Sequence, residues 1–188
     1  MKIAINGSLG SGKSTVAKKL AEEMGWTYLS TGARFRAMAK ERGMDLGAFS
    51  EMAEKDPGID QAVDDWLRSF NDSEKNLIID SRMAPFFIQD ALKIRLKVSD
   101  SEGARRIFSD TTRGEEESFS AIEEAEKAYR LRSRSEVTRY FDKYGVDVED
   151  ETQYDLVIDT SQLTVQQVCD RIQQRLLDHA PQAKIQEL

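Results

Sequence analysis

A run of small and polar residues near the N-terminus constrains the fold of this chain more than any other stretch. Residues 7–14 read Gly-Ser-Leu-Gly-Ser-Gly-Lys-Ser, between a short apolar run at 3–5 and a segment whose apolar residues recur every four positions. The glycines allow positive-φ turns that direct successive backbone N–H groups toward an anion. The pattern G-x-x-x-x-G-K-S between a strand and a helix therefore predicts a phosphate-binding P-loop.

Each part of this loop has a predicted task in binding a nucleoside triphosphate with magnesium. Lys13 reaches the β- and γ-phosphates, and the Ser14 hydroxyl is a ligand for Mg²⁺. The N-terminus of the following helix contributes further N–H donors and a partial positive charge. We assign the donor nucleotide, expected to be ATP, to Gly7, Ser8, Leu9, Gly10, Ser11, Gly12, Lys13, Ser14 and Thr15.

Composition narrows the class of protein. A chain of 188 residues is long enough for one α/β domain, and its formal charge of −7 argues against general affinity for nucleic acid or membranes. Cys169 and His179 are the single cysteine and histidine, which excludes an internal disulfide and a histidine-dependent triad or metal site. We expect a cytoplasmic protein that binds nucleotide substrates and neither nucleic acid nor a membrane. We expect a monomer, and an oligomer stays open.

Strand and helix patterns alternate along the chain. Apolar runs predict strands at 3–5, 26–30, 76–80 and 154–159, with amphipathic helical patterns between them. Residues 91–98 alternate instead, which predicts a strand with one side only partly covered. Ser99 with Glu102, and Thr164 with Gln167, have the spacing of capping boxes for the helices that follow them. The alternation of strands with helices is typical of a parallel sheet with helices on both faces. We expect an α/β, three-layer αβα fold around a central parallel sheet of about five strands. One domain would span 1–178, with a helical acceptor-binding insertion at 31–72 and a polar tail at 179–188.

Two charged residues follow predicted strands. Asp80 ends the third strand, the position of a Walker B acid that holds Mg²⁺ directly or through water. Arg36 follows the carboxyl end of the second strand, where ligands of open α/β sheets bind, and its guanidinium fork suits phosphate oxygens. The alternatives without a function are an ordinary cap for Asp80 and a surface helix position for Arg36.

The motifs together resemble the nucleoside monophosphate kinases, and most closely the cytidylate kinases of the archaeal type. The resemblance extends to about residue 177, and the segment 83–87 differs from the pattern expected in that family. Beyond the P-loop, the matching stretches are 30–36, 41–46 with 49–50, 80–82, 132–140, 144–147 and 154–161.

The resemblance implies an acceptor site and a lid. Ser30, Gly32 and Arg36 would approach the acceptor nucleotide, with Arg36 on its phosphate, and Asp80 and Arg82 would lie beside it. Arg82 could instead neutralise Asp80. A lid at about 104–140 would supply arginines to the transferring phosphoryl group, although these arginines could also pair with surface glutamates. The expected catalytic residues are Lys13, Arg113, Arg132 and Arg139.

Three functions remain open from the sequence. The first is phosphoryl transfer from ATP, with Mg²⁺, to a nucleoside monophosphate, with CMP or dCMP as the first candidates. A phosphomonoester has a second pKa near 6 and needs no base at neutral pH. The second function is a P-loop kinase acting on a hydroxyl with Asp80 as base, and the third is a regulatory nucleotide-binding module without turnover. The arginine-rich lid and the acceptor turn favour the first, since a switch needs neither.

Overall fold

The computed structural model describes residues 1–109 and 122–179. Its strands form one parallel sheet in the order β2-β3-β1-β4-β5. The strands are β1 (Lys2–Gly7), β2 (Thr27–Ser30), β3 (Leu77–Asp80), β4 (Ala91–Lys97) and β5 (Leu156–Asp159). The helices are α1 (Lys13–Met24), α2 (Thr31–Glu41), α3 (Leu46–Lys55), α4 (Pro57–Arg68), α5 (Ala84–Phe87), α6 (Asp100–Phe108), α7 (Ile122–Tyr144) and α8 (Val165–His179), with a 3₁₀ turn at Glu151–Gln153.

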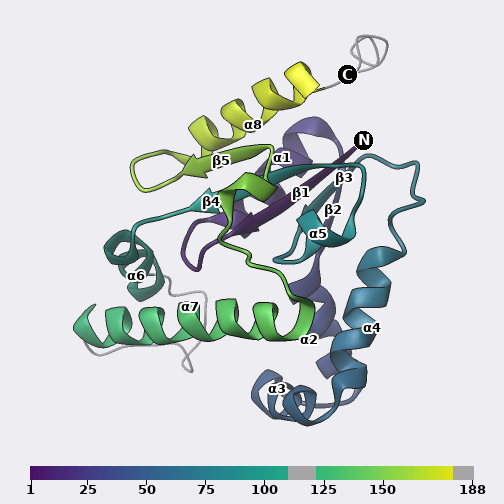
Figure 1. The fold of residues 1–188 in the computed structure, drawn as a ribbon, viewed down its shortest axis with the longest axis vertical. Coiled ribbons are helices and arrows are strands. Elements are labelled where there is room, and N and C mark those ends of the chain that lie inside the picture. Colours follow the sequence, from purple (N-terminus) through teal and green to yellow (C-terminus); the bar gives the residue numbers. More distant parts are fainter. Residues whose placement is uncertain (110–121, 180–188) are drawn as a thin grey trace.

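Helices cover both faces of the sheet, which confirms the predicted three-layer fold (Figure 1). Helices α1 and α8 bury Leu20 and Ile172 against Ile5 and Ile94 on one face. On the opposite face, α5 and the C-terminal half of α7 pack around Ile79. The central strands β1 and β3 are buried along their whole length, as expected for parallel strands covered on both sides.

Local signals in the sequence set several helix ends. The Ser30 hydroxyl accepts a hydrogen bond from the Ala33 N–H at 3.3 Å and caps α2. Before α8, Thr164 and Gln167 form a reciprocal capping box, with side-chain to backbone distances of 2.9 and 3.2 Å. Of the predicted capping box of Ser99 with Glu102, one hydrogen bond forms, from the Glu102 N–H to the Ser99 hydroxyl. The Glu102 carboxylate instead accepts hydrogen bonds from Arg105 and Arg106.

The strand register brings the predicted functional positions to one edge of the sheet. Ser30 pairs with Asp80, and Asp80 pairs with Ile5, two residues before the P-loop begins. Because the strands are parallel, the segments that follow β1, β2 and β3 all start at their carboxyl ends. The edge where open α/β sheets bind ligands therefore collects the P-loop, the turn at 30–32 and the segment after Asp80.

Helices α2, α3 and α4 form an insertion with a small core of its own, built on Met38, Phe49 and Ile59. This insertion lies beyond the β2 side of the sheet, and the long helix α7 reaches from α6 to it (Figure 1). The Tyr144 hydroxyl donates to the buried Asp64 carboxylate at 2.8 Å, and burial raises the pKa of that carboxyl. The insertion is thus tied to the C-terminal end of α7.

Two short elements were not predicted, namely α5 and the 3₁₀ turn, because four and three residues are too short to show a period. Segment 83–87, which differed from the expected family pattern, forms α5 and packs Phe87 against Tyr144. The division into one domain with an acceptor insertion and a lid stays a prediction, and most of the polar tail lies outside the described residues. None of the helices in the described ranges is both long and apolar enough to cross a membrane.

Candidate active site

The P-loop connects β1 to α1 with the backbone geometry that its glycines were predicted to allow. Gly10 and Gly12 have φ angles of 70° and 79°, in the left-handed region, and Gly12 is the N-cap of α1. The Ser8 N–H donates to the Leu96 carbonyl at 2.9 Å, and the Ser11 N–H donates to the Ser8 carbonyl at 3.1 Å. The first N–H groups of α1 have no acceptor within the helix, and they lie where the loop joins α1.

A buried carboxylate lies beside the loop. Asp80, 2% exposed, forms an ion pair with Lys13 through Oδ1 and accepts a hydrogen bond from the Tyr28 hydroxyl on Oδ2 at 2.9 Å. Ser14 follows Lys13 at the start of α1 and lies close enough to Asp80 to lower the pKa of that carboxyl. The two residues assigned to magnesium, Ser14 and Asp80, therefore lie near one another, and the ion pair with Lys13 joins Asp80 to the loop.

The charges in this cluster favour an ionised carboxylate. Burial alone raises the pKa of Asp80, but the charge of Lys13 and the polar groups of Lys13, Ser14 and Tyr28 outweigh it, so the pKa lies below the usual range. Burial and the neighbouring carboxylate raise the pKa of Tyr28 to about 12, so its hydroxyl stays a donor. Asp80 is a weak base with oxygen atoms available to a cation.

The predicted acceptor residues lie at the start of α2. Ser30 is the N-cap, and Nη1 of Arg36 lies 3.6 Å from the position that a Cβ on Gly32 would take. Arg36 is exposed, its charge acts on the Tyr28 hydroxyl, and it has no ion pair among the described residues. Arg36 thus faces the same region as the Asp80 cluster with its guanidinium available.

Arg82 follows the strand that ends at Asp80, whose ion pair is with Lys13. It lines a cavity of about 330 Å³ with Arg95, Lys97 and the start of the P-loop. Arg95 was expected on a partly covered side of its strand, yet it is 5% exposed and donates to the Val148 carbonyl and, at 3.3 Å, to Glu149. Lys93 and Lys97, on the same side, are only half-buried as expected.

The lid arginines are described only in part. Arg113 lies outside the described residues, and so does the side chain of Arg132. Arg139 is exposed on α7 and donates to the Tyr140 hydroxyl at 3.4 Å, with its guanidinium 5.2 Å from that ring. The catalytic roles of these three arginines stay predictions.

Comparison with known proteins identifies the family. Residues 2–162 match the cytidylate kinase-like family. The chain belongs to this family. A cytidylate kinase of Methanosarcina mazei is 38% identical over 173 residues, which cover 90% of this chain and 93% of that protein. The resemblance to cytidylate kinases is therefore confirmed, and the chain is a P-loop kinase of the cytidylate kinase-like family.

Two further proteins are similar to this chain, one in sequence and one in structure. An S-adenosylmethionine-dependent nucleotide dehydratase of Lacinutrix mariniflava is 36% identical over 172 residues. That match covers 91% of this chain, which spans only 35% of the dehydratase. The structure of shikimate kinase from Bacteroides thetaiotaomicron has a TM-score of 0.64 and 15% identity, covering 94% of this chain and 98% of that one. This likeness shows the shared P-loop kinase fold alone.

Two features of this cytidylate kinase-like site were missed by sequence reasoning. The first is the contact of Tyr28 with Asp80. Only the register of β2 against β3 indicates it, because Tyr28 lies two residues before Ser30, which pairs with Asp80. Arg106 falls in the predicted lid segment, yet it contacts the P-loop and Thr160 at the end of β5. No local pattern reveals a contact between residues 96 positions apart.

Proposed function

We propose that this chain transfers the γ-phosphoryl group of ATP to a nucleoside monophosphate, with CMP or dCMP as the preferred acceptor. The observation that carries the proposal is the arrangement around Asp80. A P-loop lysine, a buried ionised carboxylate and an exposed acceptor-side arginine all face one edge of the sheet. Family membership and the cytidylate kinases among its relatives support this acceptor.

The donor site would be formed by the P-loop. Since Ser8 and Ser11 use their N–H groups within the fold, the N–H groups of the glycines and of the first turn of α1 would hold the phosphates. Lys13 would leave Asp80 for the β- and γ-phosphates, and its charge would oppose the negative charge of the transferring group. The proposed ATP site is the stretch assigned from the sequence, residues 7–15.

Magnesium fits the donor set of Ser14 and Asp80. Mg²⁺ prefers hard oxygen ligands and commonly combines one or two carboxylates with phosphate oxygens. An ionised carboxylate with a serine hydroxyl near it offers that chemistry at the end of the P-loop. When bound, the metal supplies charge neutralisation on the phosphate oxygens.

The acceptor would lie between the turn at 30–36 and the segment after β3. Ser30, Gly32 and Arg36 would approach the monophosphate, with Arg82 and Asp80 beside it. The exposed guanidinium of Arg36 can form two parallel hydrogen bonds to phosphate oxygens. Helices α2 to α4 would cover this acceptor, and a lid at about 104–140 would bring Arg113, Arg132 and Arg139 to the phosphoryl group.

The chemistry of Asp80 supports a phosphate rather than a hydroxyl acceptor. A general base for a hydroxyl works best with a pKa near the working pH, whereas the pKa of Asp80, paired with Lys13 in this structure, lies below the usual range. A phosphomonoester is already a dianion above its second pKa near 6. The alternative of a kinase for alcohols with Asp80 as base is therefore less well supported, even though the fold is shared with shikimate kinases.

Replacing Arg36 by lysine tests the acceptor side. Arg36→Lys keeps the positive charge but loses the planar fork, so we expect kcat/KM for CMP to fall about ten- to a hundredfold. ATP binding should stay within about twofold, because the P-loop is a separate site. Steady-state kinetics with CMP and a titration with ATP measure the two effects.

The matched control is Arg34→Lys, in which the exchanged arginine pairs with Glu41 at 3.2 Å on the same helix. This control should change neither quantity. If Arg36→Lys weakens ATP and leaves acceptor kinetics as they were, Arg36 belongs to the donor side, and the turn at 30–36 is not the monophosphate site.

A further inference from the structure

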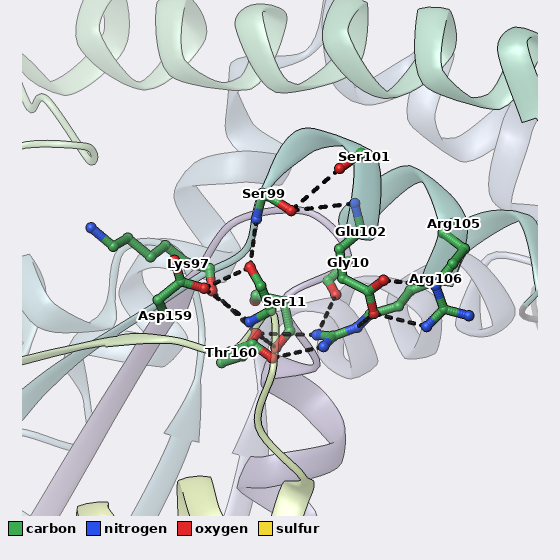
Figure 2. A network of polar contacts seen from close by, with 11 residues as sticks. Gly10, Ser11, Lys97, Ser99, Ser101, Glu102, Arg105, Arg106, Asp159 and Thr160 are labelled. Carbon is green, nitrogen blue, oxygen red and sulfur yellow. Dashed lines mark hydrogen bonds and ion pairs between the residues drawn. The ribbon is translucent and has the colours of Figure 1, made fainter.

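Arg106 connects helix α6 to the P-loop and to the end of β5 (Figure 2). Its guanidinium donates to the Gly10 carbonyl at 3.3 Å, to the Thr160 hydroxyl at 3.1 Å and to the Thr160 carbonyl at 2.7 Å. Nε donates to Glu102, one turn earlier on α6, at 2.8 Å. All three guanidinium nitrogens are thus engaged by protein acceptors, and three of the four acceptor atoms lie outside its own helix, on Gly10 and Thr160.

Thr160 extends this network to the next carbonyl of the loop. It is 2% exposed, and its hydroxyl lies 3.1 Å from both the Ser11 and the Lys97 carbonyl oxygens. The single hydroxyl proton serves one of these carbonyls at a time, while the oxygen accepts from Arg106. The carbonyls of Gly10 and Ser11 therefore both point toward the Arg106–Thr160 pair.

Close packing holds the same part of the loop against α6. A Cβ on Gly10 would lie 2.6 Å from the Gly103 carbonyl oxygen, and a Cβ on Gly103 would lie 2.7 Å from the ring of Tyr129 on α7. Leu9 packs against the buried cluster formed by α6 and Tyr129. The outer arc of the P-loop, residues 9–11, thus rests directly on the helix that carries Arg106.

Because the peptide bond is planar, these contacts fix the orientation of two peptide groups in the loop. In a trans peptide, the carbonyl of one residue and the N–H of the next point in opposite directions. The Gly10–Ser11 peptide is bonded on both sides, by Arg106 at its carbonyl and by the Ser8 carbonyl at its N–H. Where the Ser11 carbonyl binds Thr160, the N–H of Gly12 must point the other way, toward the interior of the loop.

We propose that Arg106 is a positioning residue that, together with Thr160, fixes the Gly10–Ser11 and Ser11–Gly12 peptide planes so that the Gly12 N–H faces the donor phosphates. Glycines on both sides of Ser11 leave these planes free to rotate without such anchors. A rotated plane would present a carbonyl oxygen to the phosphates and repel them. The inference rests on the proposed function, because it assumes that the P-loop holds the donor phosphates.

Binding of two probes by three variants tests this role. The probes are ATP and inorganic tripolyphosphate, each with Mg²⁺, since tripolyphosphate has the phosphate chain without base or sugar. In Arg106→Met and Thr160→Val we expect the affinity for both probes to fall by the same factor, about five- to tenfold. Thr160→Ser keeps the hydroxyl and should bind both probes as the unsubstituted protein does. The acceptor KM for CMP should stay within about twofold throughout.

The control is Arg105→Met. Arg105 neighbours Arg106 on α6 and also pairs with Glu102, at 2.7 Å, but it contacts neither the loop nor Thr160. This control should bind both probes normally. If Arg106→Met proves unstable in a thermal unfolding scan, the comparison of Thr160→Val with Thr160→Ser decides alone.

Two results would overturn the positioning role. Weaker binding of ATP with unchanged binding of tripolyphosphate would mean that Arg106 contacts the base or sugar directly. Unchanged binding of both probes in folded variants would mean that the contacts of Arg106 and Thr160 do not determine the conformation of the P-loop. Failure of the proposed function is a separate result. The unsubstituted protein would bind neither probe if the P-loop holds no phosphates, and it would bind both without release of ADP in the presence of CMP if the acceptor is not a nucleoside monophosphate.

Discussion

Lys13→Ala is expected to lower kcat at least about a hundredfold, as deletions of single electrostatic contacts to a transition state commonly do. In the proposed reaction, Lys13 moves from Asp80 to the transferring phosphoryl group, and alanine provides no charge there. Single-turnover measurements at saturating ATP, Mg²⁺ and CMP isolate the chemical step from binding. Unchanged turnover in a folded Lys13→Ala protein would end the kinase proposal.

The same substitution should also reduce stability. The Lys13 side chain is 18% exposed and pairs with the buried Asp80. Losing the cation leaves a buried carboxylate without its ion pair, at a cost of up to about 3 kcal/mol. Urea unfolding measures this cost. The matched control is Lys19→Ala on the same helix, which removes only an exposed pair with Glu23.

The pH dependence of this stability has a definite sign. The pKa of Asp80 is lower in the folded state than its ordinary value of 3.8, so its contribution to stability is fully present above that unfolded value. It is lost as the pH falls through the lower folded pKa. Without Lys13 the folded pKa rises, so acid unfolding of Lys13→Ala should begin at a higher pH than that of the unsubstituted protein.

Asp80→Asn is expected to weaken magnesium and to lower kcat by about a hundredfold or more. Asparagine keeps the shape and can still accept the Tyr28 hydrogen bond, but it offers the metal a neutral oxygen. Titration of activity with Mg²⁺ at fixed ATP measures the shift of the metal midpoint. An unchanged midpoint would contradict the metal role of Asp80. The control Asp64→Asn replaces another buried carboxylate that binds a tyrosine hydroxyl, and it should leave that midpoint unchanged.

The fall of the rate at acid pH in Asp80→Asn distinguishes a monophosphate acceptor from a hydroxyl acceptor. If the acceptor is a monophosphate, the rate should fall below about pH 6 as the acceptor is protonated, and this limb should persist in Asp80→Asn. If Asp80 were the base for a hydroxyl, Asp80→Asn would abolish the limb. The residual activity of the variant is sufficient for this comparison when the enzyme concentration is raised.

Features that depend on local sequence were predictable. The P-loop follows from its glycine spacing, and the buried strands β1 and β3 follow from continuous apolar runs. The capping pair Thr164–Gln167 follows from residue types three positions apart. These features depend on backbone conformation and burial within a few residues, which a single sequence displays directly.

Features that depend on contacts between distant segments were not predictable. The pairing of Lys13 with Asp80 joins positions 67 residues apart, and only the strand register explains it. Arg95 follows an alternating pattern that predicted partial exposure, but the Val148–Glu149 segment covers it and supplies its acceptors. Which lid arginines reach a phosphate depends on residues outside the described ranges.

The measurement that tests the central claim most directly is release of ADP from ATP with a panel of acceptors. The panel comprises CMP, dCMP, UMP, AMP and GMP, together with alcohols such as shikimate. We expect CMP or dCMP to give the highest kcat/KM and the alcohols to leave the rate at the level of ATP alone. Release of ADP that an alcohol stimulates and no nucleoside monophosphate stimulates would contradict the proposed function.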